Sequence, residues 1–173
     1  YYIDFETLEK SITGNEKIML FCSPHNPGGK VWSINELRNI ARFCTKYDLI
    51  LISDEIHNDL VFEQKQHVMF PIAAPEIIDR QVVLVSSSKT FNIAGGLMGN
   101  VIIEDARLRK KFQQAHKATG TMPNLFGMKI AESAYTHGHS WLVQALKYIE
   151  NNIKLFDEGI DQIPGIQSMK LNS

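Results

Sequence analysis

Three short apolar runs constrain the fold of this chain more than any other feature. They have the length and composition of buried β-strands and cover Lys17 to Cys22, Leu49 to Ile52 and Val82 to Val85. A helical stripe lies between the first two runs, and Ser33 with Glu36 forms a capping box at its start. This alternation predicts an α/β fold: a mostly parallel sheet in three layers, with helices on both faces.

Each of the three predicted strands is followed by polar side chains. They are Asn26 after the first strand, Asp54 and His57 after the second, and Ser86 and Lys89 after the third. Because the carboxyl ends of parallel strands meet at one edge of a sheet, we expect these groups to lie side by side there. A lysine at the end of a buried strand is costly unless it is paired or reactive, so Lys89 is the candidate for chemistry.

This set of side chains suits pyridoxal 5'-phosphate (PLP). A desolvated lysine such as Lys89 can attack a carbonyl and hold it as a Schiff base. Asp54 can keep a pyridinium nitrogen protonated, and a lysine with an aspartate partner is expected for that cofactor. The amide of Asn26 can donate to the phenolate oxygen of the ring. Serine hydroxyls and backbone N–H groups at a turn can hold the phosphate.

Three motifs resemble those of a known family. They read SPHNPGG at 23–29, SDEIH at 53–57 and SSSKTFNIAG at 86–95. Their order and spacing are similar to those of the PLP-dependent class I/II aminotransferase superfamily (fold type I). More narrowly, they resemble its cystathionine β-lyase branch, the MalY/PatB and cystalysin type of C–S lyase. The resemblance runs from Tyr1 to about Phe156. It implies a partial PLP-binding large domain over residues 1–158 and the truncated start of a small domain over 159–173.

The resemblance implies a role for each polar residue that could face the cofactor ring. Lys89 would be the catalytic residue and would carry PLP as a Schiff base. Asp54 would pair with the pyridine nitrogen, and Asn26 would contact the phenolic oxygen. His57 would make the same oxygen contact, at the position where aminotransferases usually have tyrosine.

The phosphate end of the site departs from the family pattern. The resemblance implies that Ser86 binds the phosphate and that Ser88 offers a second hydroxyl. Aminotransferases usually place a phosphate-binding arginine eight residues after the lysine, where this chain has Leu97. Other groups would therefore have to neutralise the phosphate. This departure favours the lyase branch over a typical transaminase.

The implied reaction is PLP-dependent α,β-elimination. Cystathionine or a cysteine conjugate would yield pyruvate, ammonia and a thiol, with the amine of Lys89 removing the Cα proton. Two alternatives stay open: an aminotransferase of the same fold, and a regulatory binding protein that uses this fold as a docking surface. The chain opens on Tyr1 without an initiator Met. We expect a piece of a homodimeric enzyme that is inactive by itself, because the family's N-terminal segment and its carboxylate-binding arginine lie elsewhere.

Composition narrows the range of partners. Lys and Arg total 18 against 19 for Asp and Glu, so a net charge of −1 gives no electrostatic case for nucleic acid or a membrane surface. No apolar run reaches the length of a membrane span. Cys22 and Cys44 have neither metal nor disulfide spacing, which favours a reducing cytoplasm. His137 and His139 lack acidic or cysteine support, so we expect no metal site.

The pattern after the lysine turn predicts a fourth strand and three helices. The strand covers Asn100 to Ile103, and a basic helix with a solvated face begins after Asp105. The two further helices are expected at about 124–136 and 140–156. Ile166 to Leu171 could begin another strand. Nearer the start of the chain, a possible short helix near Pro75 interrupts an irregular stretch over residues 62–79.

Overall fold

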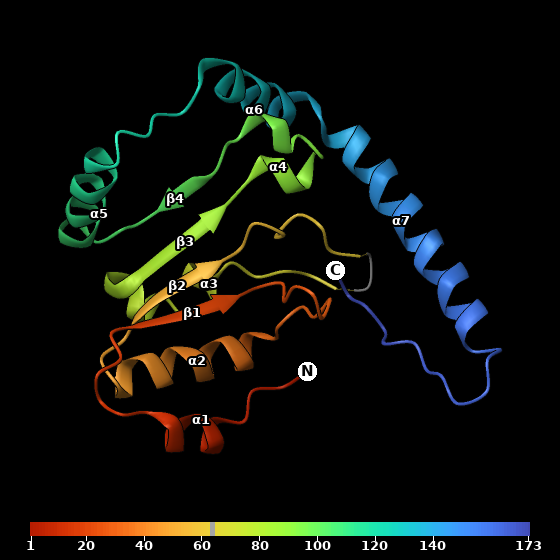
Figure 1. Cartoon of the computed structure of the whole chain (residues 1–173), viewed down its shortest axis with the longest axis horizontal. Helices are drawn as coiled ribbons and strands as arrows, with labels where there is room; N and C mark the ends of the chain where they lie inside the picture. The colour runs from red at the N-terminus through yellow and green to blue at the C-terminus, as the bar shows by residue number, and fades with distance from the viewer. Residues whose placement is uncertain (63–64) are drawn as a thin grey trace.

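A four-stranded sheet in the order β1-β2-β3-β4 forms the centre of the computed structural model, which describes residues 1–62 and 65–173 (Figure 1). Its strands are β1 Ile18–Cys22, β2 Ile50–Asp54, β3 Gln81–Val85 and β4 Asn100–Ile102. The pairs β1–β2 and β2–β3 are parallel, whereas β4 runs antiparallel to β3. The expected α/β class with a mostly parallel sheet is therefore confirmed.

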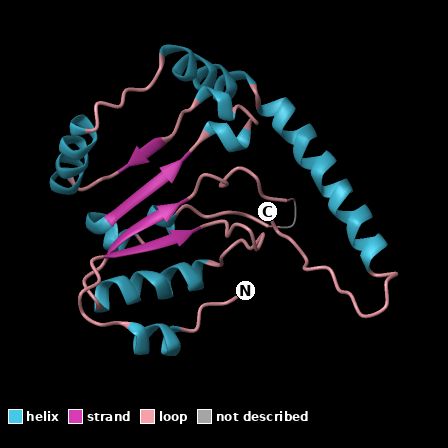
Figure 2. Ribbon diagram, viewed as in Figure 1, coloured by secondary structure: helices cyan, strands magenta, loops and turns pink. Residues whose placement is uncertain are grey.

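Helices connect the strands and follow the last of them (Figure 2). Those before β4 are α1 Phe5–Ser11, α2 Ile34–Lys46, α3 Phe70–Ala73 and α4 Ser87–Thr90, with 3₁₀ turns at Pro75–Arg80 and Ala94–Gly96. After β4 come α5 Ala106–Ala118, α6 Leu125–His137 and α7 His139–Ile160. The predicted capping box of Ser33 and Glu36 is present at the start of α2. Asp105 caps α5 through the N–H of Leu108, as expected.

The hydrophobic core lies between α2 and one face of the sheet. Leu37, Ile40 and Cys44 of α2 are all 1% exposed or less, so the apolar stripe seen in the sequence is the buried face of the helix. They belong to the same buried cluster as Leu51 of β2 and Phe70 of α3. This packing fixes the direction of β1 and β2, and with it the place where their carboxyl ends emerge.

The opposite face of the sheet is more exposed at β1. Ile18 and Leu20 are 51% and 76% exposed, whereas Phe21 of the same strand is 7% exposed. Alternate residues of a strand point to opposite faces, so the buried and the open faces of β1 are the two sides of one sheet. The helix α7 extends beyond the carboxyl ends of the parallel strands (Figure 1).

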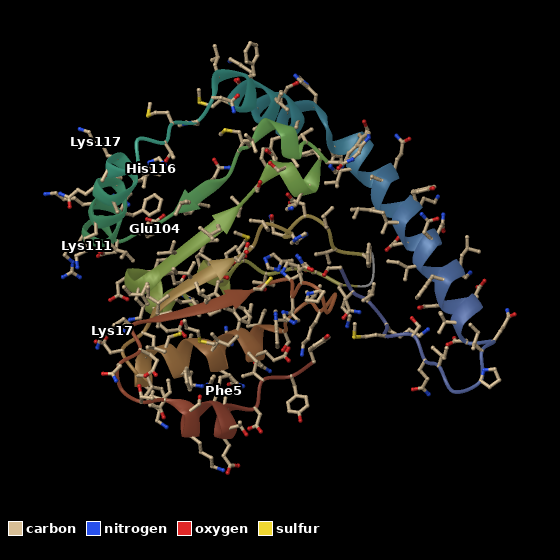
Figure 3. All side chains as sticks on the ribbon, in the orientation of Figure 1. Phe5, Lys17, Glu104, Lys111, His116 and Lys117 are labelled. Atoms are coloured by element: carbon tan, nitrogen blue, oxygen red, sulfur yellow. The ribbon has the colours of Figure 1, made fainter. Side chains whose placement is uncertain are left out.

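The basic helix α5 has no buried residue, and its labelled side chains Lys111 and Lys117 point away from the sheet (Figure 3). This confirms that its charge run forms a solvated face. Among the described residues, no helix is long and apolar enough to cross a membrane.

The carboxyl-terminal tail corrects one expectation. Residues 166–171 form no strand, so the prediction of a new strand there is wrong. Instead the tail runs back to two loops: the N–H of Asn172 donates to the carbonyl of Gly29 at 2.6 Å, and the N–H of Phe62 donates to the carbonyl of Asn172 at 3.2 Å. The irregular stretch after Phe62 contains α3 and the 3₁₀ turn at Pro75–Arg80, and its positions 63–64 lie outside the described residues.

Candidate active site

The carboxyl ends of the three parallel strands meet at one edge of the sheet. Cys22 at the end of β1 pairs with Asp54 at the end of β2, and Asp54 pairs in turn with Leu84 of β3. The N–H of Ser23 then donates to the carbonyl of Asp54 at 2.9 Å. The N–H of Glu55 donates to the carbonyl of Leu84 at 2.8 Å. This register places the segments that carry the predicted site residues next to one another, as the alternation of strands and helices indicated.

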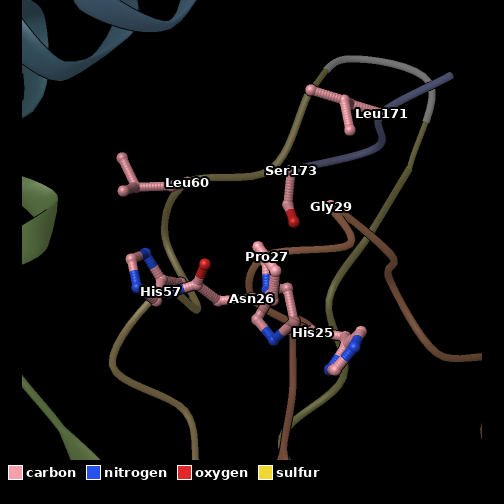
Figure 4. Close-up of a pocket in the computed structure, with 9 residues that line it drawn as sticks. His25, Asn26, Pro27, Gly29, His57, Leu60, Leu171 and Ser173 are labelled. Carbon is pink, nitrogen blue, oxygen red and sulfur yellow. The ribbon is translucent and has the colours of Figure 1, made fainter. Parts of the chain in front are cut away.

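Asn26 and His57 line a small pocket at this edge (Figure 4). Its volume is about 180 Å³, and its wall includes Leu171 and Ser173 from the tail. The other lining residues are Pro24, His25, Pro27, Gly29 and Leu60. Cofactor pockets usually measure about 300–1,000 Å³. A whole cofactor therefore needs more room than this pocket offers and would extend beyond it or displace the tail.

His57 reports that the polar groups of the edge lie close together. Burial lowers the pKa of its imidazole, and the positive charge of Lys89 lowers this pKa further. The negative charge of Asp54 acts in the opposite direction and raises it. The net result is a pKa below the ordinary value, so His57 is neutral at neutral pH and one ring nitrogen carries a proton that it can donate.

Asp54 is the last residue of β2, and its carboxylate takes part in the turn that follows. The oxygen Oδ1 accepts a hydrogen bond from the N–H of Ile56 at 3.3 Å. Such a local bond orients the carboxylate without neutralising it. A capping role and a role toward a pyridinium nitrogen are therefore compatible.

The two serines assigned to the phosphate both donate to one backbone carbonyl. Ser86 Oγ donates to the carbonyl of Met98 at 2.6 Å, and Ser88 Oγ donates to the same oxygen at 3.1 Å. Since a hydroxyl has one proton, each serine would have to rotate before it could donate to a phosphate. Leu97, at the position of the missing arginine, is 81% exposed. The phosphate role of these serines stays a prediction.

A buried carboxylate beside the site escaped the sequence reasoning. Glu55 is fully buried, and its Oε1 accepts hydrogen bonds from Ser53 Oγ at 2.9 Å and from the N–H of Phe70 at 3.0 Å. Its Oε2 lies 2.7 Å from His67 Nε2. These bonds hold the backbone next to Asp54. The sequence signal was weak, because His67 lies twelve residues from Glu55 in an irregular stretch.

A second missed pair joins the lysine turn to the loop after β2. Thr90 follows Lys89 in α4, and its hydroxyl donates to Asp59 Oδ2 at 2.8 Å. Both residues stand close to predicted site residues in the sequence. Their pairing could not be foreseen, because it depends on how α4 packs against a loop that is 31 residues away along the chain.

The side chains at this edge fit PLP by their chemistry. An amine, a carboxylate, an amide and a neutral imidazole are the groups that its aldehyde, ring nitrogen and phenolic oxygen require. The hydroxyl of Ser87, in the lysine turn, is buried and has no hydrogen-bond partner among the described residues. A buried polar atom without a partner is unusual in a native protein and is consistent with a turn that a ligand completes. The described residues hold no cluster that could bind a metal ion.

Comparison with known proteins points to one group of enzymes. The family described as aminotransferase class I and II matches residues 1–173. Cystathionine beta-lyase PatB of Bacillus subtilis (strain 168) is 34% identical over 173 residues, which cover 98% of this chain and 45% of that protein. Kynurenine–oxoglutarate transaminase 3 of Homo sapiens is 35% identical over 97 residues, 56% of this chain and 21% of that protein.

A solved structure with a bound cofactor shares the fold of this chain. Cystalysin from Treponema denticola, which contains a pyridoxal 5'-phosphate cofactor, superposes with a TM-score of 0.90 at 40% identity. The match covers 94% of this chain and 42% of that one. The chain thus spans less than half the length of these relatives.

Proposed function

The chain belongs to the class I and II aminotransferase family, and from this premise we propose that it supplies the PLP-binding part of a C–S β-lyase. The observation that carries the proposal is the register of the parallel strands, which pairs Cys22 with Asp54 and Asp54 with Leu84. The segments that bear Asn26, His57 and Lys89 therefore leave the same edge of the sheet. The effects of Lys89 and Asp54 on the pKa of His57 agree with this placement. The similarity to PatB and cystalysin supports the lyase branch.

Each residue near the proposed ring position has a task that its chemistry allows. PLP, when bound, supplies an electron sink for the negative charge that develops at Cα. The amine of Lys89 holds the cofactor and, once released, takes the Cα proton of the amino acid. The carboxylate of Asp54 keeps the ring nitrogen protonated. The amide of Asn26 and the neutral imidazole of His57 donate hydrogen bonds to the phenolic oxygen.

The phosphate is held in this proposal by Ser86, Ser88 and backbone N–H groups of the lysine turn. Both hydroxyls donate to the carbonyl of Met98, so they face the same side of the turn. With Leu97 in place of an arginine, the turn brings no positive charge of its own at that position. The remaining phosphate charge would be met by groups from the rest of the protein.

We also propose how this chain is divided between the domains of the whole protein. Residues 1–158 would form part of the large domain, and 159–173 would begin a small domain, although α7 continues to Ile160. The complete enzyme would act in the cytoplasm as a homodimer, without nucleic acid or membrane as partner. Sedimentation analysis of the complete protein tests the assembly: a dimer supports it, and a monomer at micromolar concentration rejects it.

One assay separates the lyase from the alternative that the transaminase relatives support, an aminotransferase of the same fold. The complete protein that contains this chain is loaded with PLP and given L-cystathionine, and pyruvate is measured. A second reaction supplies an amino acid with 2-oxoglutarate, and glutamate is measured. Release of pyruvate is the expected result. Formation of glutamate without pyruvate would reject the lyase and favour the aminotransferase.

A further inference from the structure

One hydrogen bond joins the two segments that carry the candidate site. Thr90 lies directly after Lys89 in α4 and is 1% exposed. Its hydroxyl donates to Asp59 Oδ2 at 2.8 Å, and Asp59 follows His57 by two residues. The bond therefore connects the lysine turn directly to the loop that carries Asp54 and His57.

Both partners of this bond are themselves held in place. Asn58 Nδ2 donates to the second carboxylate oxygen of Asp59 at 3.1 Å. In α4, the N–H of Phe91 donates to the carbonyl of Ser87 at 3.0 Å, so Thr90 lies inside a closed helical turn. Because both partners are held in place, this bond links the position of one segment to that of the other.

A third element meets the same pair. Burial and the negative charge of Asp59 raise the pKa of Tyr135 in α6, and the hydroxyl of Thr90 acts on this pKa in the opposite direction. The ring of Tyr135 packs edge-on against Phe91 with a centroid distance of 5.4 Å. The loop after β2, α4 and α6 therefore converge at Thr90.

We propose that Asp59 and Thr90 are a positioning pair, which sets the distance between Lys89 and the two groups Asp54 and His57. This inference rests on the proposed function. A hydrogen bond to a carboxylate is roughly twice as strong as one between neutral groups. Displacement of a reacting group by about 1 Å can lower the rate about a hundredfold. A bond that fixes the lysine turn relative to the loop with Asp54 and His57 would therefore matter, because Lys89 must reach a cofactor that this loop helps to hold.

Amide hydrogen exchange tests, without any cofactor, whether the bond between Asp59 and Thr90 couples the two segments. Thr90→Val removes the hydroxyl while keeping the shape, Asp59→Ala removes the acceptor, and Thr90→Ser keeps the hydroxyl. We expect amide exchange to accelerate by about tenfold in both segments, residues 55–62 and 87–93, in the first two variants, as for loss of a hydrogen bond to a charged group. The double variant should be no faster than either single variant, and Thr90→Ser should stay close to the parent.

The matched control is Thr45→Val on α2, which removes a hydroxyl that donates to the carbonyl of Ala41 at 3.0 Å, away from the site. It should leave exchange in both segments unchanged. If Thr90→Val loosens α4 but leaves 55–62 as in the parent, the pair does not couple the segments and the proposal is overturned. Equal effects of Thr90→Ser and Thr90→Val would overturn it as well.

A second readout separates this inference from the proposed function. The complete protein that contains this chain is incubated with PLP and reduced with borohydride, and labelling of Lys89 is compared with labelling of Lys111 by peptide mapping. The preference for Lys89 should fall several-fold in Thr90→Val and Asp59→Ala and persist in Thr90→Ser. Parental labelling in Thr90→Val would reject the positioning pair and leave the function standing. Coupled exchange without labelling of Lys89 in the parent would support the pair and reject the function.

Discussion

At the scale of single residues, His57 is where the charges of the candidate site can be measured. Its pKa is lowered by burial and by the charge of Lys89, and it is raised by Asp54. These opposing effects mean that the titration of one imidazole reports on the positions of two other groups. Burial and the charge of Lys89 keep His57 neutral near pH 7, the form in which one ring nitrogen can donate a hydrogen bond.

Substitution of either charged neighbour should move the pKa of His57 in a defined direction. Lys89→Ala removes a positive charge that opposes protonation, so the pKa should rise. Asp54→Asn removes a negative charge that favours protonation, so the pKa should fall further. An NMR titration of the His57 ring measures both shifts. Lys111→Ala, a charge removed from the outward face of α5, is the control and should leave the titration unchanged; unchanged values in all three variants would contradict the geometry.

The sequence was informative about single residues only where chemistry and position coincide. Asp54 ends β2, and Asn26 and Lys89 each follow the end of a strand within four residues, so their type and place could both be interpreted from the sequence. The bond between Thr90 and Asp59, and that between Glu55 and His67, depend on tertiary contacts between distant segments. No local pattern encodes such contacts.

At the scale of elements, the strands β1 and β2 have one face buried against the core and one face that is more open. Leu51 of β2 is completely buried against the core around α2, whereas Leu20 of β1 is 76% exposed. Both are leucines in the middle of parallel strands. Their side chains point to opposite faces of the sheet, and β1 is its edge strand whereas β2 is an inner one. The two leucines therefore compare a core position with an open one.

The two leucines should respond very differently to truncation. Leu51→Ala leaves a cavity in the core and should lower the free energy of unfolding by about 2–5 kcal/mol. Leu20→Ala removes an exposed side chain and should change it by about 0.5 kcal/mol or less. Urea unfolding of both variants measures the difference. Equal losses would show that the open face of β1 is covered when the chain is in solution.

The capping box at the start of α2 makes a smaller and separate contribution. Ser33 accepts a hydrogen bond from the N–H of Glu36, and Glu36 accepts one from the N–H of Ser33 at 2.8 Å. Ser33→Ala should therefore cost about 1 kcal/mol of stability. Ser140→Ala, an exposed serine inside α7, should change stability by about 0.5 kcal/mol or less. Similar losses in the two urea titrations would rule out a special role for the cap.

Elements with a strong local signal could be predicted from the sequence, and the others could not. The strands, the stripe of α2 and the cap of α5 follow from apolar periodicity and capping residues. The apolar residues of Ile166 to Leu171 favour the start of a strand, but the tail forms none. Its backbone instead bonds with the loops at Gly29 and Phe62, and Ser168 and Lys170 of the tail contact Asp157 of α7. Partners in such distant segments are not encoded in the local sequence.

At the scale of the whole molecule, the sheet brings together segments from three parts of the chain. Their carboxyl ends share one edge, and a pocket between Asn26 and His57 opens there. The chain spans less than half the length of its relatives. In our proposal, this edge is the part of the site that this segment of the protein provides.

The central claim is that Lys89 is the lysine that holds PLP, and one measurement tests it most directly. The complete protein that contains this chain is incubated with PLP, reduced with borohydride, digested and mapped by mass spectrometry. The pyridoxyl group should be found predominantly on Lys89. It should be lost from that peptide in Lys89→Ala, whereas Lys111→Ala should keep it. Labelling spread over the surface lysines, with no preference for Lys89, would contradict the account.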